Sequence, residues 1–201
     1  MNATASDALA LTRHRAQKPA SAGVLQRIEA RVDAVFGADN PLRYLGGMSF
    51  FLFWVITVSG LYVYAVFDTS VLGAYQSVEY LTREQWYLGG IMRSLHRYAS
   101  DAFLVVVFLH LIKELVRGHF RGFRWFSWVS GVPLLWLMYA SGIGGYWLVW
   151  DEVAAFSLTA TMEWLDWLPL FAQPLVRNFL SAGQISARFF SLLIFLHIGI
   201  P

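Results

Sequence analysis

Hydrophobic residues gather in four long stretches of the chain, and the segments between them hold most of the charges. The stretches cover about residues 46–67, 96–116, 126–150 and 186–201. A helix needs about 20 mostly apolar residues to cross a bilayer, and the first and third stretches contain no charged residue at all. The pattern therefore predicts an all-α membrane protein, built as a transmembrane four-helix bundle.

The fourth stretch reaches only from residue 186 to residue 201, where the sequence ends. A helix that stops inside lipid leaves carbonyl groups without hydrogen-bond partners, which the hydrocarbon region does not tolerate. We therefore expect the fourth helix to be truncated and the sequence to be the front part of a longer chain.

The chain before the first stretch has a different character. Its opening residues are mostly small or polar, and residues 24–37 then place apolar side chains at helical spacing with charges between them. This spacing is typical of an amphipathic helix on a membrane surface, although a helix packed against a soluble domain has the same pattern. We expect an N-terminal segment, residues 1–40, that contains this surface helix, followed by a transmembrane domain over residues 41–201.

Composition narrows the class of protein. Hydrophobic residues make up 57% of the chain and charged residues 14%, against about 25% charged residues in soluble domains. A net charge of +2 argues against a nucleic-acid partner. The sequence has no cysteine, which excludes disulfides, thiolate metal sites, iron–sulfur clusters and thioether-linked haem.

The positive charges predict an orientation. Ten of the 15 lysines and arginines lie in the N-terminal segment, before the first stretch, or in the link between the second and third stretches. Lysine and arginine mark cytoplasmic loops, so we expect a cytoplasmic N-terminus in a multi-pass protein of the bacterial inner membrane. The loops at 68–95 and 151–185 would then face the opposite side.

Three histidines lie in or beside the apolar stretches, where ionisable side chains are costly and usually functional. His96 and His110 are fourteen residues apart, which puts them on one helix face about 21 Å apart along its axis. His197 lies at the depth of His96 in the predicted bundle. Imidazole is a common axial ligand of haem iron. Hydrogen bonds between helices or a proton path explain one such histidine better than three at matching depths, so haem ligation is the favoured interpretation.

Glycines repeat the same interval in the other two stretches. Gly46 and Gly60 are fourteen residues apart, and so are Gly131 and Gly145. Bare backbone at these points would let a flat ring or another helix approach closely. Arg93, three residues before the first of the membrane histidines, is a candidate partner for haem propionates.

Several motifs resemble one family in order and spacing. The sequence resembles the N-terminal, haem-binding half of cytochrome b from quinol-oxidising bc-type complexes, and most of all the photosynthetic, plastoquinol-oxidising branch. The resemblance runs over about residues 40–201 and rests on YLGG (44–47), AYQSVEYLT (74–82), RSLHRYAS (93–100), WVSGV (128–132), GYWLVWDEV (145–153) and GQISARFF (183–190).

The resemblance implies a four-helix bundle that holds two b haems. His96 and His197 would ligate the haem on the outer side of the membrane. His110 would ligate the haem on the cytoplasmic side, with a partner histidine beyond Pro201, so that this haem lacks one ligand within the chain. The four glycines fall on the family's haem-packing positions, and the arginine falls on its propionate-binding position.

Three departures from the family pattern affect what can be carried over. Tyr44 stands where the photosynthetic branch has a haem-attaching cysteine, so no third haem is expected. Val149 and Trp150 replace a proline–tryptophan pair beside the quinol-oxidation pocket. Arg188 lies nine residues before His197, whereas the corresponding arginine of the family lies five residues before its histidine, so the role of that arginine is not carried over. Apart from these departures, the half of the family that carries the proline–glutamate motif of quinol oxidation is absent from this sequence, which leaves quinol oxidation open.

The expected function is electron transfer across the membrane between quinone or quinol and partner redox proteins, such as a cytochrome c or an iron–sulfur protein. A second copy of the chain is a further candidate partner. Two alternatives remain: a b-type haem anchor subunit of a dehydrogenase or reductase, and a non-haem membrane scaffold or proton-conducting subunit. Arg43, Tyr44 and Lys113 lie near the predicted cytoplasmic haem and are candidates for a quinone pocket, although topology anchoring is the favoured role for the two cations.

Overall fold

The structure, a computed structural model, describes residues 20–168, 180–181 and 184–200. This part of the chain is almost entirely helical, apart from one antiparallel pair of two-residue strands. In chain order the elements are α2 (Ala20–Phe36), η1 (Gly37–Asp39), η2 (Pro41–Arg43), α3 (Leu45–Val66), α4 (Ala74–Arg83), η3 (Trp86–Gly90), α5 (Ile91–Val116), η4 (Gly122–Arg124), α6 (Trp125–Trp147), α7 (Glu152–Asp166), β1 (Leu180–Ser181), β2 (Gln184–Ile185) and α9 (Ala187–Gly199).

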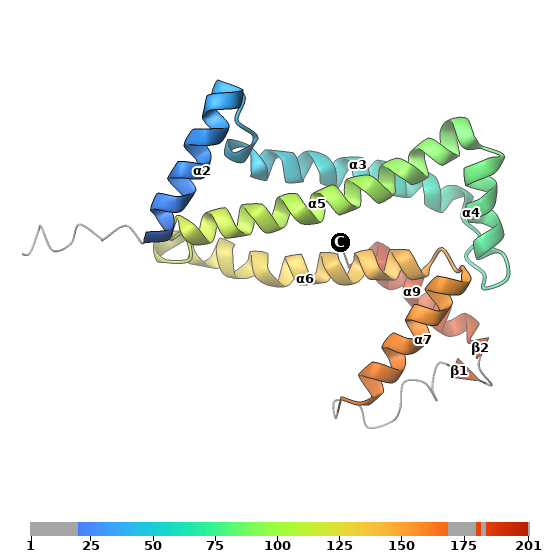
Figure 1. The fold of residues 1–201 in the computed structure, drawn as a ribbon. Coiled ribbons are helices and arrows are strands. Elements are labelled where there is room, and N and C mark those ends of the chain that lie inside the picture. The colour runs from blue at the N-terminus through green and yellow to red at the C-terminus, as the bar shows by residue number, and fades with distance from the viewer. Residues whose placement is uncertain (1–19, 169–179, 182–183, 201) are drawn as a thin grey trace, which may run out of the picture.

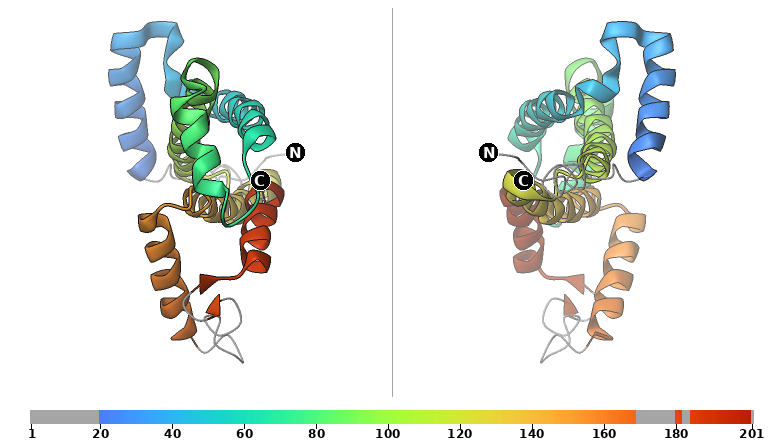
Figure 2. Two further views of the ribbon diagram at one scale, coloured as in Figure 1. Left: turned by 90° about the vertical axis from the view of Figure 1, so that its right-hand side faces the viewer. Right: turned by 90° about the vertical axis from the view of Figure 1, so that its left-hand side faces the viewer.

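Helices α3, α5 and α6 run side by side along the length of the molecule (Figure 1). The end-on views in Figure 2 place α3 and α5 on one side of α6, and α7 and α9 on the other. Helix α3 lies along α5 and α9 packs against α6, and we refer to these as the α3–α5 pair and the α6–α9 pair, which are joined by the packing of α5 on α6. Helix α9 has 13 residues against 26 in α5, so its contact with its partner is much shorter.

The two ends of the bundle carry different elements. Helix α2 lies across one end, close to the turn from α5 to α6, and α4 covers the other end, where α7 also leaves the bundle (Figure 1). We call these the α2 end and the α4 end. The helical stretch predicted at residues 24–37 corresponds to α2, which packs on η2 and α5.

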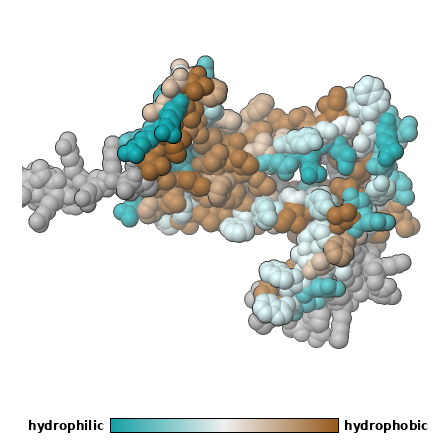
Figure 3. Space-filling view, viewed as in Figure 1, coloured by the Kyte–Doolittle hydropathy of each residue, from teal (hydrophilic) through white to brown (hydrophobic). Residues whose placement is uncertain are grey.

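The sides of the bundle are apolar and exposed. Phe50 and Phe51 on α3 are each 66% exposed, and Trp136 on α6 is 67% exposed. Figure 3 shows the apolar colour along the middle of the bundle and hydrophilic residues gathered towards its ends. By length and composition, two described helical stretches can cross a membrane, Leu45–Val66 and Gly122–Trp147. A hydrocarbon solvent accounts for these exposed aromatic side chains, which would be unfavourable in water.

Two helix boundaries differ from the sequence prediction. Helix α5 begins at Ile91, five residues before the predicted start at residue 96, because the helix continues beyond its apolar part and carries Arg93 with it. Helix α6 ends at Trp147 rather than at residue 150. Leu148 caps the helix, and turn hydrogen bonds follow up to Trp150, which has a φ of 60°. The Asp151 carboxylate then accepts the Ala154 N–H at 2.7 Å to begin α7.

The tightly packed core lies at the α4 end rather than in the middle of the bundle. Its largest buried side chains include Phe190 on α9 and Leu158 on α7, and the Trp150 ring meets Phe190 edge-on at 4.6 Å. Between the α3–α5 pair and the α6–α9 pair, by contrast, lies a cavity of about 750 Å³ lined from all four helices. Sites for small molecules have volumes of about 300–1,000 Å³, so this cavity has room for a bound group.

Candidate haem site

His96 on α5 and His197 on α9 face each other across the cavity. Their ring centroids are 6.1 Å apart and their planes are inclined at 81°, and both residues line the cavity wall. They are 101 positions apart in the sequence, and α9 comes close only because it packs against α6. The predicted pairing of these two positions therefore corresponds to a real approach of the two side chains.

Each of these rings lies against a glycine of the neighbouring helix. A Cβ atom at Gly60 would lie 2.8 Å from the His96 Cε1 atom, and one at Gly145 would lie 2.5 Å from the His197 Cε1 atom. Both distances are shorter than van der Waals contact, so any larger residue would push the imidazole away. Two of the four predicted glycines thus form cradles for the two facing rings.

The Nδ1 atom of each histidine ring is held by a backbone carbonyl. The Nδ1 atom of His96 lies 3.0 Å from the Ile56 oxygen, and the Nδ1 atom of His197 lies 2.9 Å from the Ser141 oxygen. A carbonyl can only accept a hydrogen bond, so Nδ1 carries the proton in both rings. The Nε2 atoms are then unprotonated, which is the state that binds a metal.

The geometry fits a haem iron between the two rings. A bond from an imidazole nitrogen to a first-row metal is about 2 Å, so two imidazoles that shared one iron would have ring centroids about 6 Å apart. The observed centroid distance of 6.1 Å matches this span. A haem iron can take up to two protein ligands, because the porphyrin supplies its other four nitrogens, and the pair of imidazoles here would meet that number.

Arg93 lies near this pair. Its guanidinium Nη1 donates to the Thr82 hydroxyl at 2.9 Å, and the residue lines the same cavity as the two histidines. The Thr82 hydroxyl in turn donates to the Val78 carbonyl at 2.7 Å. This chain of bonds fixes the arginine between α4 and α5, where its charge faces the cavity.

The α2 end holds the other predicted histidine, but without a facing imidazole among the described residues. The His110 Nδ1 atom is buried and has no hydrogen-bond partner in the described part of the chain. A Cβ atom at Gly46 would lie 3.4 Å from the His110 Cε1 atom. A Cβ atom at Gly131 would instead lie 3.4 Å from the Leu111 side chain. The structure therefore brings Gly46 to the ring and leaves Gly131 beside a leucine.

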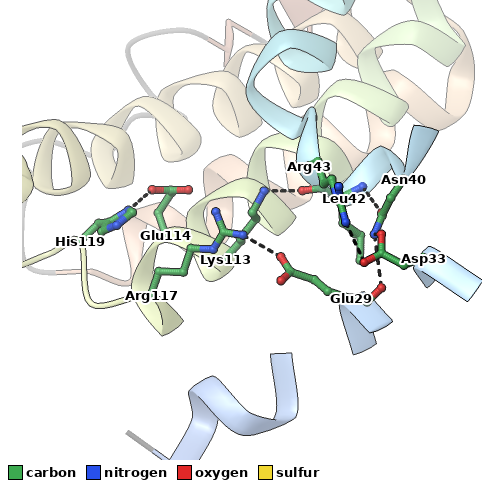
Figure 4. A network of polar contacts seen from close by, with 9 residues as sticks. All are labelled: Glu29, Asp33, Asn40, Leu42, Arg43, Lys113, Glu114, Arg117 and His119. Carbon is green, nitrogen blue, oxygen red and sulfur yellow. Dashed lines mark hydrogen bonds and ion pairs between the residues drawn. The ribbon is translucent and has the colours of Figure 1, made fainter. Parts of the chain in front are cut away.

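Polar residues beside His110 join α2 to the bundle (Figure 4). Lys113 is buried and donates to the Leu42 carbonyl, and Arg43 pairs with Asp33 at 2.8 Å. Both cations considered for a quinone pocket are therefore engaged in contacts within the protein, and their role as topology anchors stays a prediction.

Further contacts complete this network. Arg117 pairs with Glu29 at 2.8 Å, and His119 pairs with Glu114. The Asn40 side-chain amide donates to Asp33 at 2.8 Å. The hydrogen bonds from Asn40 and from Arg43 hold the pKa of the Asp33 carboxyl below its ordinary value.

Sequence reasoning missed the hydroxyl groups beside the two facing histidines. Ser59 donates to the Val55 carbonyl at 2.6 Å and lies 3.4 Å from the His96 Nδ1 atom. Ser141 lies 3.4 Å from the His197 Nδ1 atom and donates to the His197 carbonyl at 3.0 Å. Their positions in the sequence could have indicated them, because Ser59 directly precedes Gly60 and Ser141 lies one helical turn before Gly145.

Comparisons with known proteins identify the family of the chain. The family model described as cytochrome b/b6/petB matches residues 40–201. The menaquinol:cytochrome c reductase cytochrome b subunit of Geobacillus thermodenitrificans is 28% identical over 156 residues, which are 75% of this chain and 69% of that protein.

A solved structure described as a hyperthermophilic respiratory Complex III has the same fold, with a TM-score of 0.66 at 18% identity. That match covers 79% of this chain but 43% of the chain in the solved structure, so this sequence spans less than half of that relative. The family match extends over most of the sequence and over every described element of the bundle. The chain belongs to the cytochrome b family of membrane proteins, whose members normally bind b-type haem.

Proposed function

We propose that this chain is a b-type di-haem cytochrome that carries electrons across the membrane between quinol or quinone and partner redox proteins. One observation carries the proposal: His96 and His197 face each other at 6.1 Å with glycine behind each ring and both Nδ1 protons on carbonyls. No ordinary packing requirement explains two imidazoles with free Nε2 atoms that meet across a cavity.

At the α4 end, the proposed roles follow from the contacts. His96 and His197 hold one haem through their Nε2 atoms, and Gly60 and Gly145 provide the space for their rings. When bound, the haem supplies one-electron redox chemistry at its iron. Arg93 offers a positive charge to the propionates from the cavity wall.

At the α2 end, His110 is the proposed ligand of the second haem, with Gly46 behind its ring. Gly131 is proposed as the fourth packing glycine, and no second imidazole for this haem is seen among the described residues. A buried ring nitrogen without a hydrogen-bond partner is costly, so we expect the His110 Nδ1 atom to bond to a group outside the described residues. The His96 and His110 positions lie about 21 Å apart along α5, which sets the separation of the two sites.

The proposed partners follow from the relatives. The names of the curated relative and of the solved structure describe a menaquinol:cytochrome c reductase subunit and a respiratory complex, which supports quinol and redox subunits as partners. The distribution of basic residues supports a multi-pass protein of the bacterial inner membrane with its N-terminus in the cytoplasm. A second copy of the chain remains a candidate partner.

A second candidate function is a b-type haem anchor for a dehydrogenase or reductase. The observation in its favour is the Val149–Trp150 pair, which replaces the proline–tryptophan pair that the family has beside its quinol-oxidation pocket. The purified complex separates the two. Quinol-dependent reduction of cytochrome c supports the first function, whereas a quinone-linked dehydrogenase activity without it supports the anchor.

The decisive experiment is a reduced-minus-oxidised spectrum of the purified full-length protein, with haem measured per polypeptide. We expect a b-type α band and two haems. A protein without that band would overturn the haem proposal and leave the non-haem scaffold. One haem per polypeptide would overturn the di-haem assignment alone. His119→Ala is the matched control, because His119 lies outside both proposed sites and pairs with Glu114, so its haem content should equal that of the unmodified protein.

A further inference from the structure

The main-chain carbonyl of His197 has no helical donor. In an α-helix this oxygen would accept the N–H of the residue four positions later. That residue is Pro201, and proline has no N–H. The carbonyl of the preceding residue is satisfied, since the Ile200 N–H donates to the Leu196 oxygen at 3.0 Å. The sequence alone thus leaves an unpaired acceptor on the residue proposed as a haem ligand.

Ser141 on α6 supplies the missing donor. Its hydroxyl donates to the His197 carbonyl at 3.0 Å, and its own carbonyl accepts the His197 Nδ1 proton at 2.9 Å. Ser141 is only 5% exposed, so water does not compete for these bonds. One buried residue therefore holds both the backbone and the ring of the same histidine.

The facing histidine is held differently. Four residues after His96 comes Ser100, which has a backbone N–H, and its hydroxyl also donates to the His96 carbonyl at 2.6 Å within the same helix. The ring of His96 is bound by Ile56, whose side chain has no polar group. No bond from α3 to the His96 carbonyl is seen in the described residues. The two-point contact is a feature of the α6–α9 pair.

This difference matches the packing of the two pairs. Helix α5 has 26 residues and lies along α3 over most of its length, whereas α9 has 13 residues. A long contact fixes the rotation and register of a helix through many side chains. A short helix has fewer such contacts, so a hydrogen bond at the ligand itself contributes more to fixing the rotation and register of the helix.

We propose that Ser141 and Pro201 act together as a positioning pair for His197. The proline removes the helical donor and leaves the carbonyl of His197 free, and the Ser141 hydroxyl takes that carbonyl and fixes the register of α9 against α6. The inference rests on the proposed function, because it assumes that His197 is a haem ligand. It assigns to Ser141 a positioning role through His197 and no contact with the haem.

The test is a double-mutant cycle in the full-length protein, with Ser141→Ala, Pro201→Ala and the combination. Alanine at 141 keeps the backbone carbonyl and removes only the hydroxyl. Alanine at 201 restores an N–H that can satisfy the His197 carbonyl within the helix. Ser141→Thr keeps the hydroxyl and should retain the function. Ser191→Ala is the matched control, since the Ser191 hydroxyl donates to Ala187 within α9 and touches neither histidine.

The readouts are the content of the haem at the α4 end and its low-temperature electron paramagnetic resonance g-values, which report the orientation of the ligand planes. We expect Ser141→Ala to weaken retention of this haem about 10–100-fold, the usual effect of losing a bond that orients a ligand, and to shift its g-values. In the Pro201→Ala background the same change should have little effect. Recovery of protein accumulation in the double variant supports the pairing if Ser141→Ala accumulates poorly.

Two results would overturn the inference. One is an Ser141→Ala protein with normal haem retention and normal g-values. The other is an equal loss with and without Pro201, which would mean that the hydroxyl acts independently of the freed carbonyl. In both cases a normal b-type spectrum in the unmodified protein leaves the proposed function standing. Absence of that spectrum would instead remove the proposed function first.

Discussion

Each end of the bundle contains a histidine proposed as a haem ligand, but only the histidine at the α4 end faces a second imidazole among the described residues. At the α4 end, His96 meets His197, and the Nδ1 atoms of both rings are bonded. At the α2 end, His110 has a buried Nδ1 atom without a partner in the described part of the chain. The difference teaches that a ligand position depends on more than one neighbouring helix, because at the α4 end α3 supplies the carbonyl that orients His96 and α9 supplies the facing imidazole.

The close contacts follow the same contrast. At the α4 end, a Cβ atom at Gly60 would lie 2.8 Å from the His96 ring, and one at Gly145 would lie 2.5 Å from the His197 ring. At the α2 end, the corresponding distance from Gly46 to the His110 ring is 3.4 Å. The surroundings differ as well, since the α2 end is held by the ion pair of Arg117 with Glu29 on α2 and by the hydrogen bond from Lys113 to the Leu42 carbonyl. Four predictions test this contrast, in order of decreasing effect.

Removal of the ligands should separate the two ends completely. His197→Leu should abolish the haem at the α4 end and leave the other haem in place, because the iron there would lose one of its two protein ligands. His110→Leu should have the opposite result. Potentiometric titration of the α band in each variant measures which haem remains. Loss of both haems from either variant, in protein that still accumulates in the membrane, would contradict the assignment of separate sites.

Added side-chain volume should affect the α4 end more than the α2 end. Gly145→Ala places a Cβ 2.5 Å from the His197 ring, and overpacking of this kind costs about 1–3 kcal/mol. We expect a large loss of the haem held by His197. Gly46→Ala should be milder, since its distance to His110 is 3.4 Å.

Haem retention under dilution or mild detergent measures both effects. Gly144→Ala is the matched control, because its Cβ would lie 4.0 Å from the nearest His197 atom, an ordinary contact. Equal haem loss from Gly144→Ala and Gly145→Ala would mean that the helix, and not the cradle, is sensitive to the added methyl group.

Loss of the arginine beside the cavity should change a potential rather than remove a haem. Arg93→Gln takes away a positive charge that stabilises the reduced, more negative state, so the midpoint potential of the haem at the α4 end should fall. A tenfold change in a one-electron equilibrium corresponds to about 59 mV, and we expect a shift on that order or smaller. Arg83→Gln, at an exposed ion pair with Glu79, is the control. A shift of the other haem alone would place Arg93 in the wrong site.

The contacts of α2 should respond weakly to acid. The Asp33 carboxylate has a lowered pKa because Asn40 and Arg43 bond to it, so its stabilising contribution is present above the ordinary pKa of the carboxyl and is lost as the pH falls through the lower value of the folded state. Hydrogen exchange of α2 should therefore increase in acid. Asp33→Asn should reduce this dependence and leave both haem spectra unchanged. Identical pH profiles of the two proteins would mean that Asp33 does not contribute to the attachment of α2 to the bundle.

Much of this arrangement could be predicted from the sequence, because it depends on residue spacings within single helices. The spacing of His96 and His110 fixes their common face on one helix, and the interval from Gly46 to Gly60 fixes two bare points on another. The distribution of charge separated membrane segments from loops. The starts and ends of helices were harder to predict, since α5 begins five residues before its apolar part and α6 ends at Trp147, inside its apolar stretch.

The hydroxyl contacts could not be predicted from the sequence, for a different reason. Ser141 has nothing unusual in its own stretch of sequence, and a serine in an apolar helix commonly bonds to its own backbone, as Ser59 does with Val55. Its bond to the His197 carbonyl depends on the packing of α9 against α6. The proline at 201 was visible as a missing donor, but the identity of the replacement required the fold.

The sequence by itself determined the membrane-spanning character, the identity of the histidines and glycines, and their spacing along each helix, because helical geometry converts a residue interval directly into a position. The tertiary structure decided which imidazoles meet, which ring nitrogen is free, and which hydroxyl holds His197. These are contacts between residues tens of positions apart, and they depend on the register of one helix against another. That register is set by side-chain packing over the whole interface, which no single stretch of sequence contains.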